Sequence, residues 1–143
     1  MALPEPEVGL VIHFNYLWKR EHDLARDNAR YARPCAIVVA QRRQADGTVM
    51  VLVAPITHAV PRINTAAVEI PSAVKRHLGL DDARSWVVTD EVNEFVWPGF
   101  DLQPNSEGQI AYGVLPNRLF QQIRASVIAQ IEARRLERVL RGT

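Results

Sequence analysis

The sequence predicts a single α+β domain that is mainly β, a small antiparallel barrel with helices packed on it. Short apolar strands fill most of the chain, beginning with the alternating segment 8–14. Two further apolar runs, 35–40 and 48–54, are separated by Asp46-Gly47, a pair typical of tight hairpin turns, which predicts two adjacent central strands. Apolar residues then recur at helical spacing over 116–141, which predicts a long C-terminal helix.

The length and composition of the chain limit its class. With 143 residues, 48% of them hydrophobic and 23% charged, the chain is expected to form one domain over 1–143, with the barrel at 8–115. The net charge of +1 does not favour a strongly cationic nucleic-acid-wrapping protein. A single cysteine, Cys35, excludes an internal disulfide and is interpreted as a small buried hydrophobe. No secretion signal or membrane span is evident, so we expect a cytoplasmic protein that does not bind membranes.

Between the central strands and the C-terminal helix, the pattern predicts shorter elements. Residues 15–32 are charged and are expected to form a long loop with at most a helical turn or two. A short strand fits 66–70, followed by a helix over 71–78 that Gly79 closes. A further strand is expected over 85–92. Two prolines and two glycines make 97–108 a loop.

Motifs for nucleotide, metal and serine-hydrolase chemistry are absent from the sequence. The chain has no glycine-rich phosphate loop, no nucleophile elbow and no zinc-protease signature. Its four histidines are scattered without ligand spacing, at His13, His22, His58 and His77. We therefore expect no cofactor and no metal ion.

Two short motifs stand at the ends of the central strands. Arg33-Pro34 precedes the first strand, and Pro55-Ile56-Thr57-His58 follows the second. Because the two strands pair as a hairpin, Arg33 and Thr57 are expected near one edge of the same sheet. A guanidinium there suits a phosphate, since its planar donors engage two oxygens at once.

Together these motifs resemble the PemK/MazF family of toxin endoribonucleases from type II toxin–antitoxin modules. The resemblance spans roughly 8–131 and includes further segments at Gly9-Leu10-Val11, Thr89-Asp90-Glu91-Val92 and Leu115-Pro116. It implies an SH3-like or plasmid-maintenance-toxin-like barrel that forms a homodimer. It also implies metal-independent cleavage of single-stranded RNA, growth inhibition, and silencing by a cognate antitoxin.

The resemblance implies roles for Arg33, Thr57 and Asp90. His58, which stands where the family usually has a small hydroxylated residue, is a fourth candidate catalytic residue from its own chemistry. Arg33 would bind the phosphate and stabilise its transition-state charge, and Thr57 would position the phosphate. Asp90 is a candidate base, and His58 a candidate general acid or base because histidine titrates near neutral pH. Each residue also has a purely structural interpretation. Arg33 would be a surface residue at the start of a strand, Thr57 would cap the end of a strand, His58 would be an ordinary loop histidine, and Asp90 would form a buried ion pair.

Four further residues are candidate RNA contacts. They are the arginines of the charged loop and an aromatic residue of the later loop: Arg20, Arg26, Arg30 and Trp97. The alternative for Trp97 is that it folds back over the core as a lid. The tail of the predicted helix, 132–141, keeps an apolar stripe, which indicates packing against a second subunit or partner, or else a frayed end.

Two alternative functions stand beside the endoribonuclease, and the first rests on positions where the chain differs from the family pattern. The 15–32 loop has no glycine, and Val88 and Asn93 stand where basic residues occur in other members. These differences favour, as one alternative, a catalytically impaired barrel that binds RNA or an antitoxin. The other alternative is a gyrase inhibitor of the CcdB type, built on a related barrel.

Overall fold

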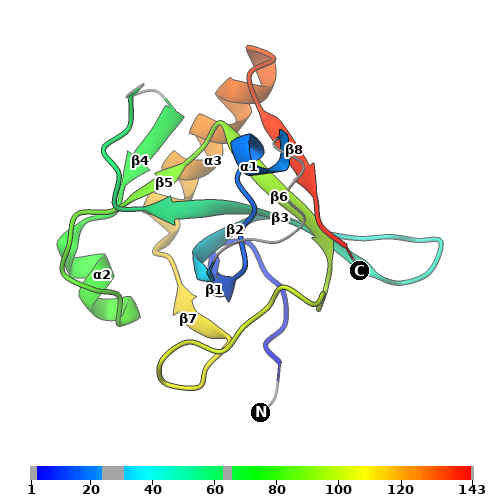
Figure 1. Cartoon of the computed structure of the whole chain (residues 1–143), viewed down its shortest axis with the longest axis horizontal. Helices are drawn as coiled ribbons and strands as arrows, with labels where there is room; N and C mark the ends of the chain where they lie inside the picture. The colour runs from blue at the N-terminus through cyan, green and yellow to red at the C-terminus, as the bar shows by residue number, and fades with distance from the viewer. Residues whose placement is uncertain (1–2, 24–30, 63–65, 143) are drawn as a thin grey trace.

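The fold is an eight-stranded, mainly antiparallel sheet with three helices, seen in a computed structural model that describes residues 3–23, 31–62 and 66–142 (Figure 1). The α+β class predicted from the sequence is confirmed. The strands are β1 (Leu10–Phe14), β2 (Arg33–Arg42), β3 (Val49–Thr57), β4 (Ala67–Glu69), β5 (Trp86–Val88), β6 (Glu91–Val96), β7 (Ala111–Val114) and β8 (Glu137–Leu140). The helices are α1 (Lys19–Asp23), α2 (Ser72–Leu78) and α3 (Asn117–Glu132).

The sheet is open at both ends. Hydrogen-bonded neighbours follow the order β4-β5-β3-β2-β1-β7, with β6 branching from β3 and β8 pairing with β6. Every pair is antiparallel except β6 and β8, which run parallel. Within the described residues β4 and β7 do not pair with each other, so the expected closed barrel is not seen.

The predicted central hairpin is present as β2 and β3. Their register places Cys35 opposite Pro55 and Arg42 opposite Val49. The turn differs from the expected two-residue type, because Gly47 has a positive φ of 73° but Asp46 does not. Instead the Asp46 carboxylate accepts hydrogen bonds from the Thr48 N–H, at 3.0 Å, and the Thr48 hydroxyl, at 2.7 Å. A side-chain turn therefore closes a longer connection.

Strand β3 continues through Pro55, where the sequence predicts its end. On one edge β3 pairs with β6 as far as Val53, and with β5 from Ile56 onward. Pro55 lies between these two paired segments, where none of the described strands pairs with that edge of β3. The missing backbone N–H of proline therefore breaks no ladder hydrogen bond on that edge. The strand therefore carries on to Thr57, which places this residue on regular structure.

The core occupies both faces of the central strands, as their continuous apolar runs predict. One cluster joins alternate residues of β2 and β3 to the inner face of α3, with members such as Ala36, Leu52, Ala54, Phe120 and Ile123. The other cluster joins the opposite residues to β1 and β6, with members such as Phe14, Cys35, Val51, Val53 and Phe95. Cys35 is fully buried, and burial raises the pKa of its thiol.

The single strand predicted over 85–92 is wrong, because it divides into β5 and β6. Thr89 and Asp90 form the bend between them, so Asp90 does not continue the face of Trp86 and Val88. The hydroxyls of Thr89 and Ser126 lie 2.6 Å apart, a hydrogen bond that fixes the bend against α3.

The predicted helix over 116–141 is also wrong in its second half. Helix α3 ends at Glu132, and Arg134 then adopts a left-handed φ of 57°. The tail turns back as β8, which places Val139 in the core and leaves Leu140 exposed. The residues 137–140, with the sequence ERVL, are compatible with either a helix or a strand. They form a strand here because they pair with the otherwise open edge of β6.

The other predicted elements agree with the structure. The helix expected over 71–78 is α2, and Gly79 ends it with a φ of 70°. The charged segment 15–32 contains the short helix α1, although its residues 24–30 lie outside the described part of the chain. Residues 97–108 form a loop, as predicted.

Candidate functional site

A pocket of about 640 Å³ opens at the end of the β2–β3 hairpin that lies opposite the turn. Arg33 at the start of β2 lines it, together with Thr57 at the end of β3 and His58 directly after it. Their meeting follows from the strand register, since Cys35 and Pro55 are partners and Arg33 and Thr57 each lie two residues beyond. The structure thus brings together three of the four candidate catalytic residues.

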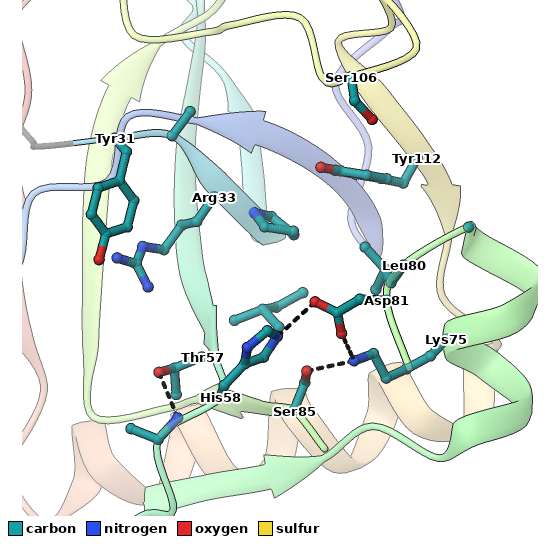
Figure 2. Close-up of a pocket in the computed structure, with 15 residues that line it drawn as sticks. Tyr31, Arg33, Thr57, His58, Lys75, Leu80, Asp81, Ser85, Ser106 and Tyr112 are labelled. Carbon is teal, nitrogen blue, oxygen red and sulfur yellow. Dashed lines mark hydrogen bonds and ion pairs between the residues drawn. The ribbon is translucent and has the colours of Figure 1, made fainter. Parts of the chain in front are cut away.

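The opposite wall of the pocket comes from elements that follow β3 in the chain. Lys75 of α2 and Asp81 of the next loop face His58, and Tyr112 of β7 lies above them (Figure 2). The Tyr112 hydroxyl lies 2.8 Å from Nδ1 of His13. Burial raises the pKa of Tyr112 and lowers the pKa of His13, so both groups are neutral at pH 7.

Arg33 is held by two aromatic rings. Its guanidinium carbon lies 5.0 Å from the centre of the Trp18 ring and 5.2 Å from the centre of the Tyr31 ring. These cation–π contacts orient the guanidinium beside the pocket, and Figure 2 shows it next to Tyr31. Arg33 Nε is buried and has no hydrogen-bond partner among the described residues. A buried donor without a hydrogen-bond partner carries an energetic cost.

A buried amide positions Trp18 for this contact. Asn93 of β6 is fully buried and makes two hydrogen bonds of 2.8 Å with Leu17, accepting from its N–H and donating to its carbonyl. This reciprocal pair ties the segment before α1 to the sheet. Asn93 therefore has a structural role at a position where the family resemblance suggests a basic residue.

The Asn93→Ala variant should lose about 2–3 kcal/mol of unfolding free energy, because both backbone groups of Leu17 are left buried without partners. Urea denaturation measures the change. Asn117→Ala at the exposed start of α3 is the matched control and should change stability little. An Asn93→Ala protein as stable as the control would show that the two hydrogen bonds do not hold this segment.

A half-buried side chain of β6, that of Glu91, holds the same segment. The Glu91 carboxylate accepts hydrogen bonds from the Tyr16 hydroxyl, at 2.9 Å, and from the Lys19 N–H, at 3.1 Å. Burial raises the pKa of the Glu91 carboxyl, although the hydrogen bonds from Lys19 and Tyr16 oppose this. The folded protein thus carries a carboxylate in a place that disfavours its charge.

The Glu91→Gln variant should be more stable than the wild type at neutral pH, because an amide oxygen can accept both hydrogen bonds without placing a charge at this half-buried position. The raised pKa means that the folded state binds the proton more tightly than the unfolded state. The gain should therefore be full above the folded-state pKa and vanish as the pH falls to the ordinary range of glutamate. Thermal unfolding at several pH values measures it, with exposed Glu107→Gln as control.

Thr57 and His58 present two different polar groups to the pocket. The Thr57 hydroxyl accepts a hydrogen bond from the Ala59 N–H at 3.1 Å, so its own proton remains available to donate. The expected strand-end contact is therefore present, and it leaves room for a ligand contact as well. His58 Nε2 lies 2.9 Å from a carboxylate oxygen of Asp81, and the His58 side chain is 57% exposed.

Asp81 is in turn held by a buried lysine. The Lys75 ammonium lies 2.5 Å from Asp81 Oδ1 and 2.7 Å from Ser85 Oγ, and it also donates to the Ala83 carbonyl. Lys75 is only 4% exposed, so these three acceptors replace the water that its charge has lost. The hydrogen bond from Lys75 lowers the pKa of the Asp81 carboxyl, which keeps it ionised at neutral pH.

The other candidate residues lie apart from this pocket or beside it. Asp90 is half-buried at the bend between β5 and β6, and it does not line the pocket. Burial raises the pKa of its carboxyl, and Glu137 adds to the effect. Trp97 packs onto the core at the turn end of β3, with its ring 6.1 Å from that of Phe95. This is the lid-like arrangement that the sequence offers as the alternative.

The candidate RNA-binding arginines have separate positions. Arg20 of α1 lies beside Trp18, with its guanidinium carbon 5.4 Å from the centre of the Trp18 ring. Arg26 and Arg30 lie outside the described residues.

Sequence reasoning missed Lys75, Asp81 and Tyr112 as parts of the pocket. The available signal was a lysine inside a short amphipathic helix, followed by Asp81-Asp82 just beyond its terminal glycine. Neither motif has a fixed spacing from His58, so only the tertiary fold connects them.

The described residues contain no cluster of three or more histidine, cysteine, aspartate or glutamate side chains that could hold a metal ion. No helix in the described part of the chain is long and apolar enough to cross a membrane. A scan against protein-family models finds no match, and a search of curated proteins finds none. The function is therefore argued from the pocket and from the resemblance of its motifs.

Proposed function

We propose that the protein is a metal-independent endoribonuclease of the PemK/MazF type, the toxin of a type II toxin–antitoxin pair that cleaves single-stranded cytoplasmic RNA and inhibits growth. The observation that carries the proposal is the pocket in which Arg33, Thr57 and His58 meet. The family resemblance assigns Arg33 and Thr57 to phosphate binding, and His58 is the candidate for proton transfer because of the chemistry of imidazole.

The chemistry of RNA cleavage fits the groups in this pocket. The 2′-oxygen of the substrate attacks the adjacent phosphorus, and negative charge grows on the non-bridging phosphate oxygens. Arg33 presents planar donors with a fixed orientation, and Thr57 has a free hydroxyl proton. Donors that are oriented in advance stabilise such charge most effectively.

Proton transfer in the proposed site falls to His58. Histidine changes its protonation state near neutral pH and is the commonest general acid or base. Asp90 is left out of the proposed site because it lies at the β5–β6 bend and does not line the pocket.

Aromatic side chains beside Arg33 suit a single-stranded substrate. Tyr31 is 65% exposed and lines the pocket, and Trp18 also lies against the guanidinium, with Arg20 near its ring. Unpaired bases stack on aromatic faces, and arginines track the phosphate backbone. This combination favours RNA over a compact small-molecule substrate.

We also propose that the sheet is an opened form of the SH3-like, plasmid-maintenance-toxin-like barrel. The support is that β3 changes partner from β6 to β5 along its length, and that the β2–β3 register shifts between Ile37 and Val39. Bends and bulges of this kind carry strands around the corners of small barrels. The resemblance extends the proposal to a homodimer and a cognate antitoxin.

The test is incubation of the purified, folded protein with a long unstructured RNA in EDTA, followed by mapping of any cuts. We expect discrete cuts that leave a 2′,3′-cyclic phosphate or 3′-phosphate. Intact RNA would contradict the proposal and favour the non-catalytic binding module. Gyrase-dependent DNA breaks on expression, with RNA intact, would favour the CcdB-type alternative.

A further inference from the structure

We propose that Asp81 is a positioning residue that orients His58 as the general base for the 2′-hydroxyl of RNA, with Lys75 as the anchor of Asp81. This inference rests on the proposed ribonuclease function and deepens it. It adds two residues, from α2 and the loop after it, that no sequence motif connects to the candidate site.

The side chains of His58 and Asp81 are in direct contact. His58 Nε2 lies 2.9 Å from Asp81 Oδ2. An ionised carboxylate only accepts hydrogen bonds, so Nε2 must carry the proton. In the neutral ring Nδ1 then holds the free lone pair. Figure 2 shows the Nδ1 side of the ring turned toward Arg33 and Thr57, where the phosphate is proposed to lie.

Polar contacts of both carboxylate oxygens restrict rotation of the Asp81 side chain. One oxygen, Oδ1, is bonded to the buried Lys75 ammonium at 2.5 Å and accepts from the Ala83 N–H at 3.2 Å, while the other faces His58. Lys75 is fixed by Ser85 and the Ala83 carbonyl. A carboxylate with one oxygen tied to a buried cation presents its second oxygen in a defined direction.

Lys75 is a buried cation whose hydrogen bonds converge on Asp81 and on the residues that follow it, Ala83 and Ser85. Burying a lysine is costly, and a hydrophobic side chain would fill the same place on α2 at less cost. Lys75 instead places its charge where it holds the carboxylate that contacts His58. The other titratable or charged groups that line the pocket around His58 are Tyr31, Arg33 and Tyr112. Asp81 is therefore the one carboxylate among the lining residues.

In the proposed step His58 accepts a proton while the RNA phosphodiester is cleaved by its own 2′-oxygen. Nδ1 of His58 takes the 2′-hydroxyl proton while the 2′-oxygen forms its bond to phosphorus, and the bond from phosphorus to the 5′-oxygen breaks. Water from the open side of the pocket protonates the departing 5′-oxygen. The hydroxide that remains is neutralised by the proton that His58 then releases. The products are a 2′,3′-cyclic phosphate and a 5′-hydroxyl, and Asp81 stays ionised throughout.

The test compares the pH–rate profiles of RNA cleavage in EDTA for the wild type, Asp81→Asn, Asp82→Asn and His58→Ala. Asp82→Asn makes the same change of charge one residue away at an exposed position. We expect Asp81→Asn to lower kcat on the order of tenfold with little change in KM, less than in a buried triad because both side chains are half exposed. Asp82→Asn should behave as wild type.

His58→Ala should lose about 10²-fold in kcat and its acidic limb, as expected for loss of a general base. The ¹⁵N NMR signals of His58 in the wild type should report the neutral ring with its proton on Nε2. A proton on Nδ1, or an Asp81→Asn profile identical to that of Asp82→Asn while the wild type cleaves RNA, would overturn this inference alone. A folded wild type that leaves RNA intact would overturn the proposed function and the base together.

Discussion

Replacing Arg33 with alanine should lower the rate of RNA cleavage on the order of 10³-fold while the protein stays folded. Among the described residues that line the pocket, Arg33 is the one that combines a positive charge, planar donors and contact with two aromatic rings. Without it the transition state loses its main source of charge stabilisation. The measurement is the rate of cleavage of an unstructured RNA, with circular dichroism to confirm the fold.

Two further variants make the result specific to Arg33. Arg33→Lys keeps the charge but cannot engage two oxygens or stack in the same way, so it should recover only a small part of the rate. Arg42→Ala removes an exposed arginine from the other end of the same strand and should cleave RNA as the wild type does. Equal rates for Arg33→Ala and Arg42→Ala would remove Arg33 from the site.

Replacing Thr57 with valine should lower the rate of cleavage by about 10²-fold, because the shape is kept and only the hydroxyl is lost. That hydroxyl accepts from the Ala59 N–H and has its proton free for a phosphate oxygen. Stability should change little, since Ala59 is exposed and water can replace the lost acceptor. Single-turnover cleavage measures the effect directly.

The matched variant for this position is Thr57→Ser, which restores the hydroxyl and should cleave RNA close to the wild-type rate. A structural role limited to the bend at the end of β3 predicts a different result. In that case Thr57→Val and Thr57→Ser would both cleave normally, and the Ala59 contact would be the whole function of the hydroxyl.

The hairpin and its two end motifs could be predicted from the sequence because they depend on local signals. The runs on either side of Asp46-Gly47 are apolar on both faces, which predicts two paired strands. Antiparallel pairing of these two strands then places Arg33 and Thr57 at the same edge of the sheet. Helix α2 was predictable for the same reason, since Pro71 and Gly79 mark its limits.

The remaining parts of the site depend on contacts between distant segments. Asn93 joins Leu17 across 76 positions, and Glu91 joins Tyr16 across 75, to hold the aromatic ring that packs on Arg33. Nothing in the local pattern distinguishes such an asparagine from an exposed one.

The end of the chain shows a similar limit. Helical spacing over 116–141 fits well up to Glu132, and beyond it the pattern is compatible with both a helix and a strand. The unpaired edge of β6 selects the strand, which becomes β8. An unpaired edge strand can form hydrogen bonds with any compatible segment close to it. This is a tertiary effect, and the hydrophobic periodicity of the sequence does not predict it.

The central claim, that single-stranded nucleic acid binds in the pocket between Arg33 and His58, can be tested by NMR titration with a 2′-deoxy oligonucleotide. Such a strand carries the phosphates and bases but lacks the 2′-hydroxyl, so it cannot be cleaved. The account predicts that the largest shifts in backbone amide signals fall on the pocket residues Arg33, Thr57, His58 and Ala59. Shifts confined to the far end of the hairpin near Trp97, or no shifts at all, would contradict it.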